Sequence, residues 1–135
     1  MKKHLVVLLS LSALACATGY NPTFYFKEVQ VVNLSAGRIA DVRVGFVGSP
    51  RTLACDEVAK NAICADLFGR RFYPQQGIEL SWTHTDGSRK SGLFAPTIPA
   101  TFNSSFALRI VMLVNADGSV KSFYEQDEPG GIYDI

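Results

Sequence analysis

The sequence predicts an all-β protein, namely a single antiparallel β-sandwich of the immunoglobulin-like type with six or seven strands, which follows an N-terminal signal peptide. Three observations predict this fold. Short segments rich in β-branched and aromatic residues recur along the chain, turn-forming residues separate them, and no long segment has the hydrophobic period of a helix. A small closed barrel is the alternative, because the number of strands does not separate the two architectures.

The first residues have the organisation of an export signal. Residues 1–4 form a short basic start, and residues 5–15 form an apolar run that is too short to span a bilayer as a helix. A segment of this kind is removed during export, so it takes no part in the folded domain.

Two cleavage alternatives remain open. Residues 15–17 have the small-x-small pattern that ordinary signal peptidase recognises, and cleavage there would remove residues 1–17. Residues 13–16 resemble a bacterial lipobox, and its cleavage would remove residues 1–15 and make Cys16 the lipidated first residue of the mature chain. We favour lipidation of Cys16.

The mature chain is expected to form one β-sandwich domain at 23–126, between a short tether at 16–22 and a flexible acidic tail at 127–135. Lys2 and Lys3 are removed with the signal, so 11 of the 13 Lys and Arg residues remain in the mature chain. All 12 acidic residues lie after the signal. The net charge is therefore about −1, which excludes the basic footprint of a nucleic-acid-binding protein.

The first two strands are expected at 23–34 and 39–47. In the first, the apolar residues change parity near Lys27 and Glu28, which predicts a bulge or a bend between sheets. The residues on the two parities are Phe24 and Phe26, then Val29 and Val31. In the second strand, alternate residues are expected to share one face, namely Ala40, Val42, Val44 and Phe46.

The segment 51–74 is the least regular part of the sequence. We expect a loop with a short helical piece there, followed by a short strand at 70–73. Once Cys16 is set aside, Cys55 and Cys64 form an even pair in an oxidising compartment, which predicts a disulfide. The disulfide is favoured over a metal pair, because the two cysteines lack nearby histidines and the spacing of a zinc site.

The second half begins with a predicted hairpin. Ile78, Leu80 and Trp82 alternate with polar residues, and Asp86 and Gly87 form the turn that leads into a return strand at 89–95. Trp82 is expected to fill the space between the two sheets.

A second predicted hairpin follows a proline-containing loop. The segment 106–115 is apolar on both parities except at Arg109, which is typical of a central strand buried on both faces. Asp117 and Gly118 turn the chain into a last strand at 120–126, with the same turn chemistry as the first hairpin.

No catalytic machinery is predicted, and we expect that the protein is not an enzyme. His84 is the single histidine after the signal and is expected to be a solvated turn residue. The sequence contains neither the Gly-x-Ser-x-Gly pattern of a hydrolase nor a glycine-rich phosphate loop. We expect no cofactor and no metal.

A candidate partner-binding surface flanks the cysteine pair. Arginine and aromatic residues are enriched at binding hot spots. The candidate residues are Arg51, Phe68, Arg70, Arg71, Phe72 and Tyr73. The alternative is an edge of the core with solvated arginines.

Three segments carry a resemblance to a known group of proteins. They are residues 13–17, RRFYPQQGIELSWTHTDG at 70–87 and LRIVMLVNADGSVKSFYEQ at 108–126. They resemble the small proteobacterial envelope lipoproteins of uncharacterised function, which carry a short signal, one cysteine pair and a compact β domain. The resemblance implies a place in the cell envelope. Because Ala17 rather than Asp follows Cys16, it also implies sorting to the outer membrane, facing the periplasm.

The expected function is that of a non-enzymatic envelope lipoprotein whose sandwich binds or supports another envelope component. The expected partners are the membrane, through the lipid on Cys16, and an envelope protein. Without lipidation the mature protein would be periplasmic. The alternative function is that of a protein inhibitor or immunity protein against a hydrolase or a toxin, which would use the Cys55–Cys64 loop region.

Overall fold

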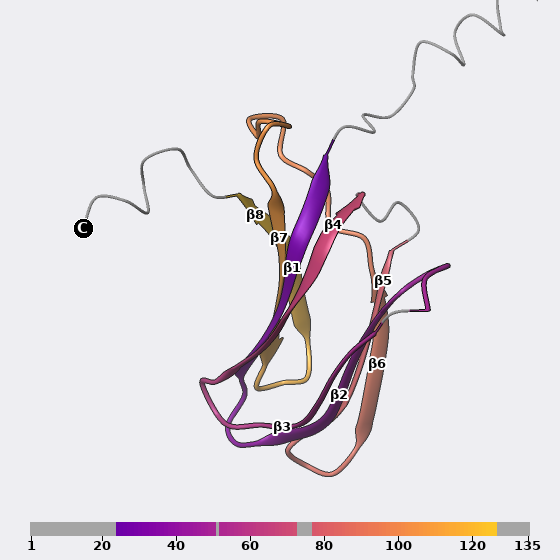
Figure 1. The fold of residues 1–135 in the computed structure, drawn as a ribbon. Helices are drawn as coiled ribbons and strands as arrows, with labels where there is room; N and C mark the ends of the chain where they lie inside the picture. Colours follow the sequence, from indigo (N-terminus) through magenta and orange to yellow (C-terminus); the bar gives the residue numbers. More distant parts are fainter. Residues whose placement is uncertain (1–23, 51, 73–76, 127–135) are drawn as a thin grey trace, which may run out of the picture.

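The protein is an all-β sandwich of two four-stranded sheets that face each other (Figure 1). The computed structural model describes residues 24–50, 52–72 and 77–126, and for residues 68–72 it describes the backbone alone. The strands are β1 (Tyr25–Leu34), β2 (Ile39–Phe46), β3 (Thr52–Val58), β4 (Ile63–Phe72), β5 (Ile78–Thr83), β6 (Arg89–Phe94), β7 (Leu108–Asn115) and β8 (Val120–Gln126).

The strand order is β4-β1-β7-β8 in one sheet and β3-β2-β5-β6 in the other. All neighbouring strands are antiparallel except β1 and β7, which pair in parallel. The predicted sandwich is confirmed, but the prediction of six or seven strands is wrong for the described residues, which form eight. The prediction of a purely antiparallel fold is wrong at the β1–β7 pair.

The predicted loop with a helical piece at 51–74 is also wrong. The structure places β3 and the long strand β4 there, joined by a tight turn at 59–62 in which Asn61 has a positive φ of 64°. Both are edge strands. In β4 apolar residues occur on the outward side as well as on the core side, as at Ile63 and Leu67 on either side of buried Cys64, so the sequence does not show the alternation of a half-buried strand. Val58, Ala59, Ala62 and Ile63 have helix-like spacing, but they belong to a strand end, a turn and a strand start.

The bulge predicted in the first strand is confirmed. The register of β1 shifts between Phe26 and Glu28 against both of its neighbours, and Phe24, Phe26, Val29 and Val31 are all buried. A second bulge, at Asp41 in β2, was not predicted. Asp41 has a positive φ of 52°, so Ile39 lies in the core in place of Ala40.

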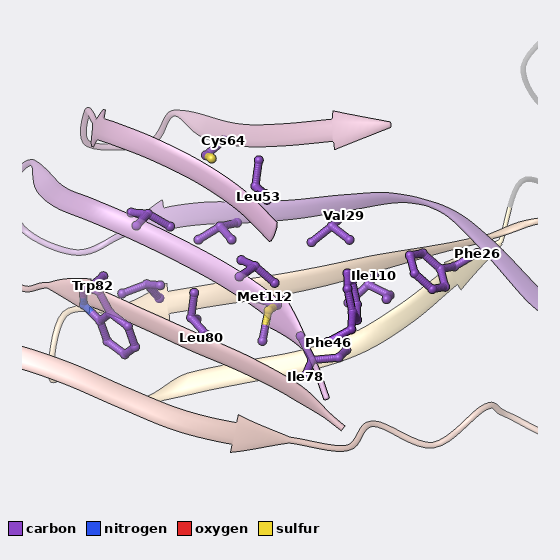
Figure 2. Packing of buried hydrophobic residues seen from close by; sticks show 14 of the residues in the cluster. Phe26, Val29, Phe46, Leu53, Cys64, Ile78, Leu80, Trp82, Ile110 and Met112 are labelled. Atoms are coloured by element: carbon purple, nitrogen blue, oxygen red, sulfur yellow. The ribbon is translucent and has the colours of Figure 1, made fainter. Parts of the chain in front are cut away.

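The core lies between the two sheets and draws side chains from both (Figure 2). Trp82 is buried, as predicted, on β5 opposite the fully buried face of β7. The outward face of β7 is less covered than expected: Val111 is buried, but Arg109 and Leu113 are half-buried. The prediction for this strand is therefore correct for one face and correct only in part for the other.

The four turns that follow β1, β3, β5 and β7 lie together at one end of the sandwich, which we call the turn end (Figure 1). A buried asparagine, Asn33, joins two of these turns. Its side-chain amide donates to the carbonyl oxygens of Val58 (2.9 Å) and Gly37 (2.8 Å), and its side-chain oxygen accepts from the N–H of Ser35 (3.0 Å). Asn33 and Ser35 are both buried away from water, and these hydrogen bonds satisfy their polar groups within the protein.

The two hairpin turns have the same structure, as the sequence predicts. Gly87 and Gly118 both have a φ of 86°, which favours glycine, and each turn is a three-residue loop closed by backbone hydrogen bonds. In the first turn the hydroxyl and N–H of Ser88 donate to the Asp86 carboxylate (2.6 and 2.9 Å) and hold the pKa of Asp86 below its ordinary value.

The second turn repeats this arrangement. The hydroxyl and N–H of Ser119 donate to the Asp117 carboxylate (2.6 and 2.9 Å) and lower the pKa of Asp117 in the same way. Both carboxylates are therefore ionised throughout the neutral and mildly acidic range.

Candidate functional site

The structure brings the two cysteines together, whereas the side chains of the predicted partner-binding cluster lie outside what it describes. Cys55 on β3 and Cys64 on β4 form a disulfide with their Cα atoms 6.4 Å apart. Cys16, Arg51 and Tyr73 lie outside the described residues. The other four predicted residues lie on the end of β4, where the structure describes the backbone but not the side chains, namely Phe68, Arg70, Arg71 and Phe72.

The disulfide has a place in the fold that its short sequence separation of nine residues does not suggest. β3 is the edge strand of one sheet and β4 is the edge strand of the other, so the bond links the two sheets along one side of the sandwich. The predicted loop between the cysteines is reduced to a turn between two strands. The disulfide therefore fastens two sheet edges and does not support a protruding loop.

A surface that the sequence analysis missed is the outward face of the β4-β1-β7-β8 sheet, which we call the apolar face. Three of its aliphatic side chains are exposed: Leu34 (44%), Ile63 (55%) and Leu67 (65%). The strand pairing places Ile63 beside Val32, and Val111 beside Phe123, on this same face. Exposed aliphatic residues that are gathered on one face are typical of an interaction surface.

The charged residues of the apolar face neutralise one another. Arg109 Nε lies 2.5 Å from Glu28 Oε1, and Arg109 Nη1 lies 3.8 Å from Glu125 Oε2. Gln30 Nε2 also donates to Glu28 Oε1 at 3.1 Å. Lys121, which pairs with Leu113, adds a second positive charge, so two acidic and two basic residues lie on this face. The net charge of these four described side chains is therefore zero.

The outward face of the other sheet is polar by comparison. Arg89 donates to the Asp41 carbonyl oxygen (2.8 Å) and to Ser81 Oγ (2.9 Å), and Arg43 Nη2 lies 3.1 Å from Asp41 Oδ1. Next to this network is a shallow hollow of about 480 Å³, lined by Arg43, Gly45, Thr52, Glu79, Ser81, Ser91, Leu93 and their neighbours. Leu93 in the lining of this hollow is an exposed aliphatic residue (61%), and Val47, directly after β2, is exposed as well (40%).

His84 is buried, so the prediction of a solvated turn residue is wrong. It is 6% exposed, because the β7–β8 turn lies over it. Trp82 Nε1 donates to His84 Nδ1 at 3.1 Å, and His84 Nε2 lies 3.0 Å from the carbonyl oxygen of Ala116. Both ring nitrogens are therefore engaged within the fold and are not presented to a substrate.

Two further features concern the part of the chain that the structure describes. No group of three or more His, Cys, Asp or Glu side chains is arranged to hold a metal ion among these residues. These residues also contain no helix with the length and apolar character needed to cross a membrane.

Comparison with known proteins gives one similar structure. No family model and no curated protein matches the chain. Among solved structures, the NMR structure of a protein from Eubacterium rectale is similar over 82% of this chain and 98% of that chain, with 12% sequence identity and a TM-score of 0.48.

Proposed function

We propose that the mature protein is a non-enzymatic component of the bacterial cell envelope, anchored to the outer membrane by a lipid on Cys16, and that its β-sandwich binds another envelope protein through the apolar face. The observation that carries this proposal is the exposure of Leu34, Ile63 and Leu67 on one face of one sheet. The tether at 17–22 would extend at most roughly 20 Å, which would keep the domain close to the bilayer.

The contrast between the two outward faces supports the choice of surface. An antiparallel sheet that faces water normally carries polar residues on that side. The β3-β2-β5-β6 sheet follows this rule through Asp41, Arg43 and Arg89, whereas the apolar face does not. Since both sheets share one core, the difference is explained by a partner that covers the apolar face.

The charges of the apolar face define the chemistry of the partner. Arg109 is already shared between Glu28 and Glu125, and Lys121 balances the second carboxylate in number, so the described side chains of this face have no net charge that would attract a strongly acidic or basic protein. We therefore assign to it a protein with an apolar, nearly uncharged surface. Four strands over six residues cover a flat area of roughly 400 Å². An interface of this size falls in the small class that is typical of transient complexes.

The docking surface is tested by Leu67→Glu, with Leu93→Glu as the matched control. The two leucines have nearly equal exposure, 65% and 61%, but lie on opposite outward faces. A photo-reactive residue placed at position 65 is expected to give a discrete adduct in cells, which identifies the partner. Purified partner should then bind the Leu67→Glu variant at least about tenfold more weakly than wild type, because a charge is buried without a counterion.

The control variant should bind the identified partner as wild type does. Equal weakening by both variants would mean that the apolar face is not the docking surface. An adduct between two copies of this chain, lost in the Leu67→Glu variant only, would show that the occupant is a second copy and would overturn the assignment of a different protein.

The lipid anchor is tested separately by metabolic labelling with a radioactive fatty acid. Wild type is expected to take up the label and Cys16→Ser is expected to lose it, because Cys16 is the proposed attachment site. Cys64→Ser is the control and should keep the label. If wild type does not take up the label, the lipid anchor is disproved and the mature protein would be periplasmic. The leucine variants would still test the docking surface in that case.

The inhibitor or immunity function has less support. It relied on an irregular loop between Cys55 and Cys64, where the structure has two strands and a turn. No contact of the described residues favours it over the first proposal.

A further inference from the structure

His84 connects the ends of two hairpins that belong to different sheets. It follows β5 directly, and its ring reaches the carbonyl oxygen of Ala116 in the turn between β7 and β8, 32 residues further along the chain. The contact lies at the turn end, where the aliphatic stem of Lys90 also lies against Gly118. This is a contact between the two sheets that is made by a titratable side chain.

The partners of the ring determine its protonation. The indole N–H of Trp82 can only donate, so His84 Nδ1 must accept and carries no proton. The carbonyl oxygen of Ala116 can only accept, so His84 Nε2 must carry one. The neutral imidazole with its proton on Nε2 satisfies both contacts at once, and this arrangement is compatible with no other protonation state.

Protonation of Nδ1 would therefore break the arrangement. The imidazolium ion has two N–H groups, and one of them would point at the indole N–H of Trp82 only about 3.1 Å away. The ring would have to turn to separate the two donors. The bond from Nε2 to Ala116 depends on the same ring position, so both contacts are coupled to a single proton.

The charged groups around the ring come from three elements. Among the described residues, Asp86 lies on the turn of His84 itself, Asp117 lies on the β7–β8 turn, and Lys90 lies on β6. The two carboxylates are ionised and attract a positive imidazolium, whereas Lys90 repels it. Burial of the ring opposes the charge as well.

We propose that His84 is an acid-sensitive latch between the two sheets. Its neutral form holds the β5–β6 and β7–β8 turns together through Trp82 and Ala116, and the gain of one proton releases them. Histidine is the side chain that gains a proton most readily on mild acidification, so acid is the signal that would open the latch. This inference does not depend on the proposed docking surface or on the lipid.

The experiment follows two NMR resonances that can be assigned without ambiguity in the mature chain. Its single tryptophan gives one indole N–H resonance and its single mature histidine gives one imidazole resonance. Both are followed by NMR on the purified mature protein between pH 8 and pH 5. As the imidazole titrates, the indole resonance is expected to shift with the same midpoint, and the protection of the indole proton from solvent exchange should fall about tenfold.

The His84→Gln variant is the matched control. Its side-chain oxygen can accept from Trp82 and its amide can donate to Ala116, but it gains no proton in this range. Its indole resonance and protection should therefore stay constant between pH 8 and pH 5. The proposal is overturned if the imidazole does not titrate in wild type, if it titrates while the indole proton stays protected, or if the glutamine variant shows the same pH step. The first two outcomes are read from wild type alone, so they hold even if the variant does not fold.

Discussion

Replacement of Asn33 by alanine is expected to lower the free energy of unfolding by about 3 kcal/mol. Asn33 is completely buried, and its amide group serves three backbone groups, the carbonyl oxygens of Val58 and Gly37 and the N–H of Ser35. Alanine would remove the partner of the Val58 carbonyl oxygen and of the Ser35 N–H, and it would leave the Gly37 carbonyl oxygen with the Ser35 hydroxyl alone (3.0 Å). A buried backbone group that loses its hydrogen bond costs about 1 kcal/mol or more.

The measurement is chemical denaturation at neutral pH, with Asn115→Ala as the control. Asn115 is at the corresponding end of β7, but its side chain binds only the exposed hydroxyl of Ser119, so its loss should cost less than about 0.5 kcal/mol. Asn33→Asp keeps the volume and removes the amide donors, so it should be at least as destabilising as alanine. Wild-type stability of Asn33→Asp would show that the hydrogen bonds to Val58 and Gly37 do not stabilise the fold.

Removal of the disulfide is the change with the second large expected effect. The Cys55→Ala/Cys64→Ala double variant should lose about 2.5 kcal/mol, because a crosslink over nine residues limits the conformational freedom of the unfolded chain by that amount in the chain-entropy model. For a domain of this size the melting temperature should fall by roughly 10 to 20 °C.

Thermal denaturation with and without a reducing agent checks this prediction. Wild type should melt at a lower temperature when Cys55 and Cys64 are reduced, and the double variant should melt at one temperature in both conditions. A reducing agent that leaves the wild-type transition unchanged would mean that the bond between β3 and β4 adds nothing to the stability of the sandwich.

Parts of the fold follow from the sequence because the signal is local. The change of parity near Lys27 predicts the β1 bulge, and alternation around Trp82 predicts a half-buried strand. The bulge at Asp41 causes no change of parity in the sequence of the strand. Alternation through Val42, Val44 and Phe46 remains regular, and only the positive φ of Asp41 moves Ile39 into the core.

The candidate sites depend on contacts between distant segments and were therefore missed. His84 ends a strand beside a turn, which suggests solvent, and it is buried only because Ala116 of another hairpin covers it. The apolar face can be recognised only when the register of β4 is known. Ile63 and Leu67 point outward because Cys64, which lies between them, faces the core and pairs with Val31 of β1.

The parallel pair of β1 and β7 has a consequence for the order in which the chain folds. Glu28 and Arg109 are 81 residues apart, so this pairing requires closure of a very long loop, whereas the hairpins of the other sheet close within a few residues. Under the proposed export, the chain would emerge from a translocation channel with its first strand in front, and β1 would lack this neighbour until Leu108–Asn115 had followed. The buried residues of β1, Phe26 and Val29 among them, are exposed during that interval. A chain exported in this way is therefore expected to be most vulnerable to aggregation and proteolysis before its final hairpin emerges.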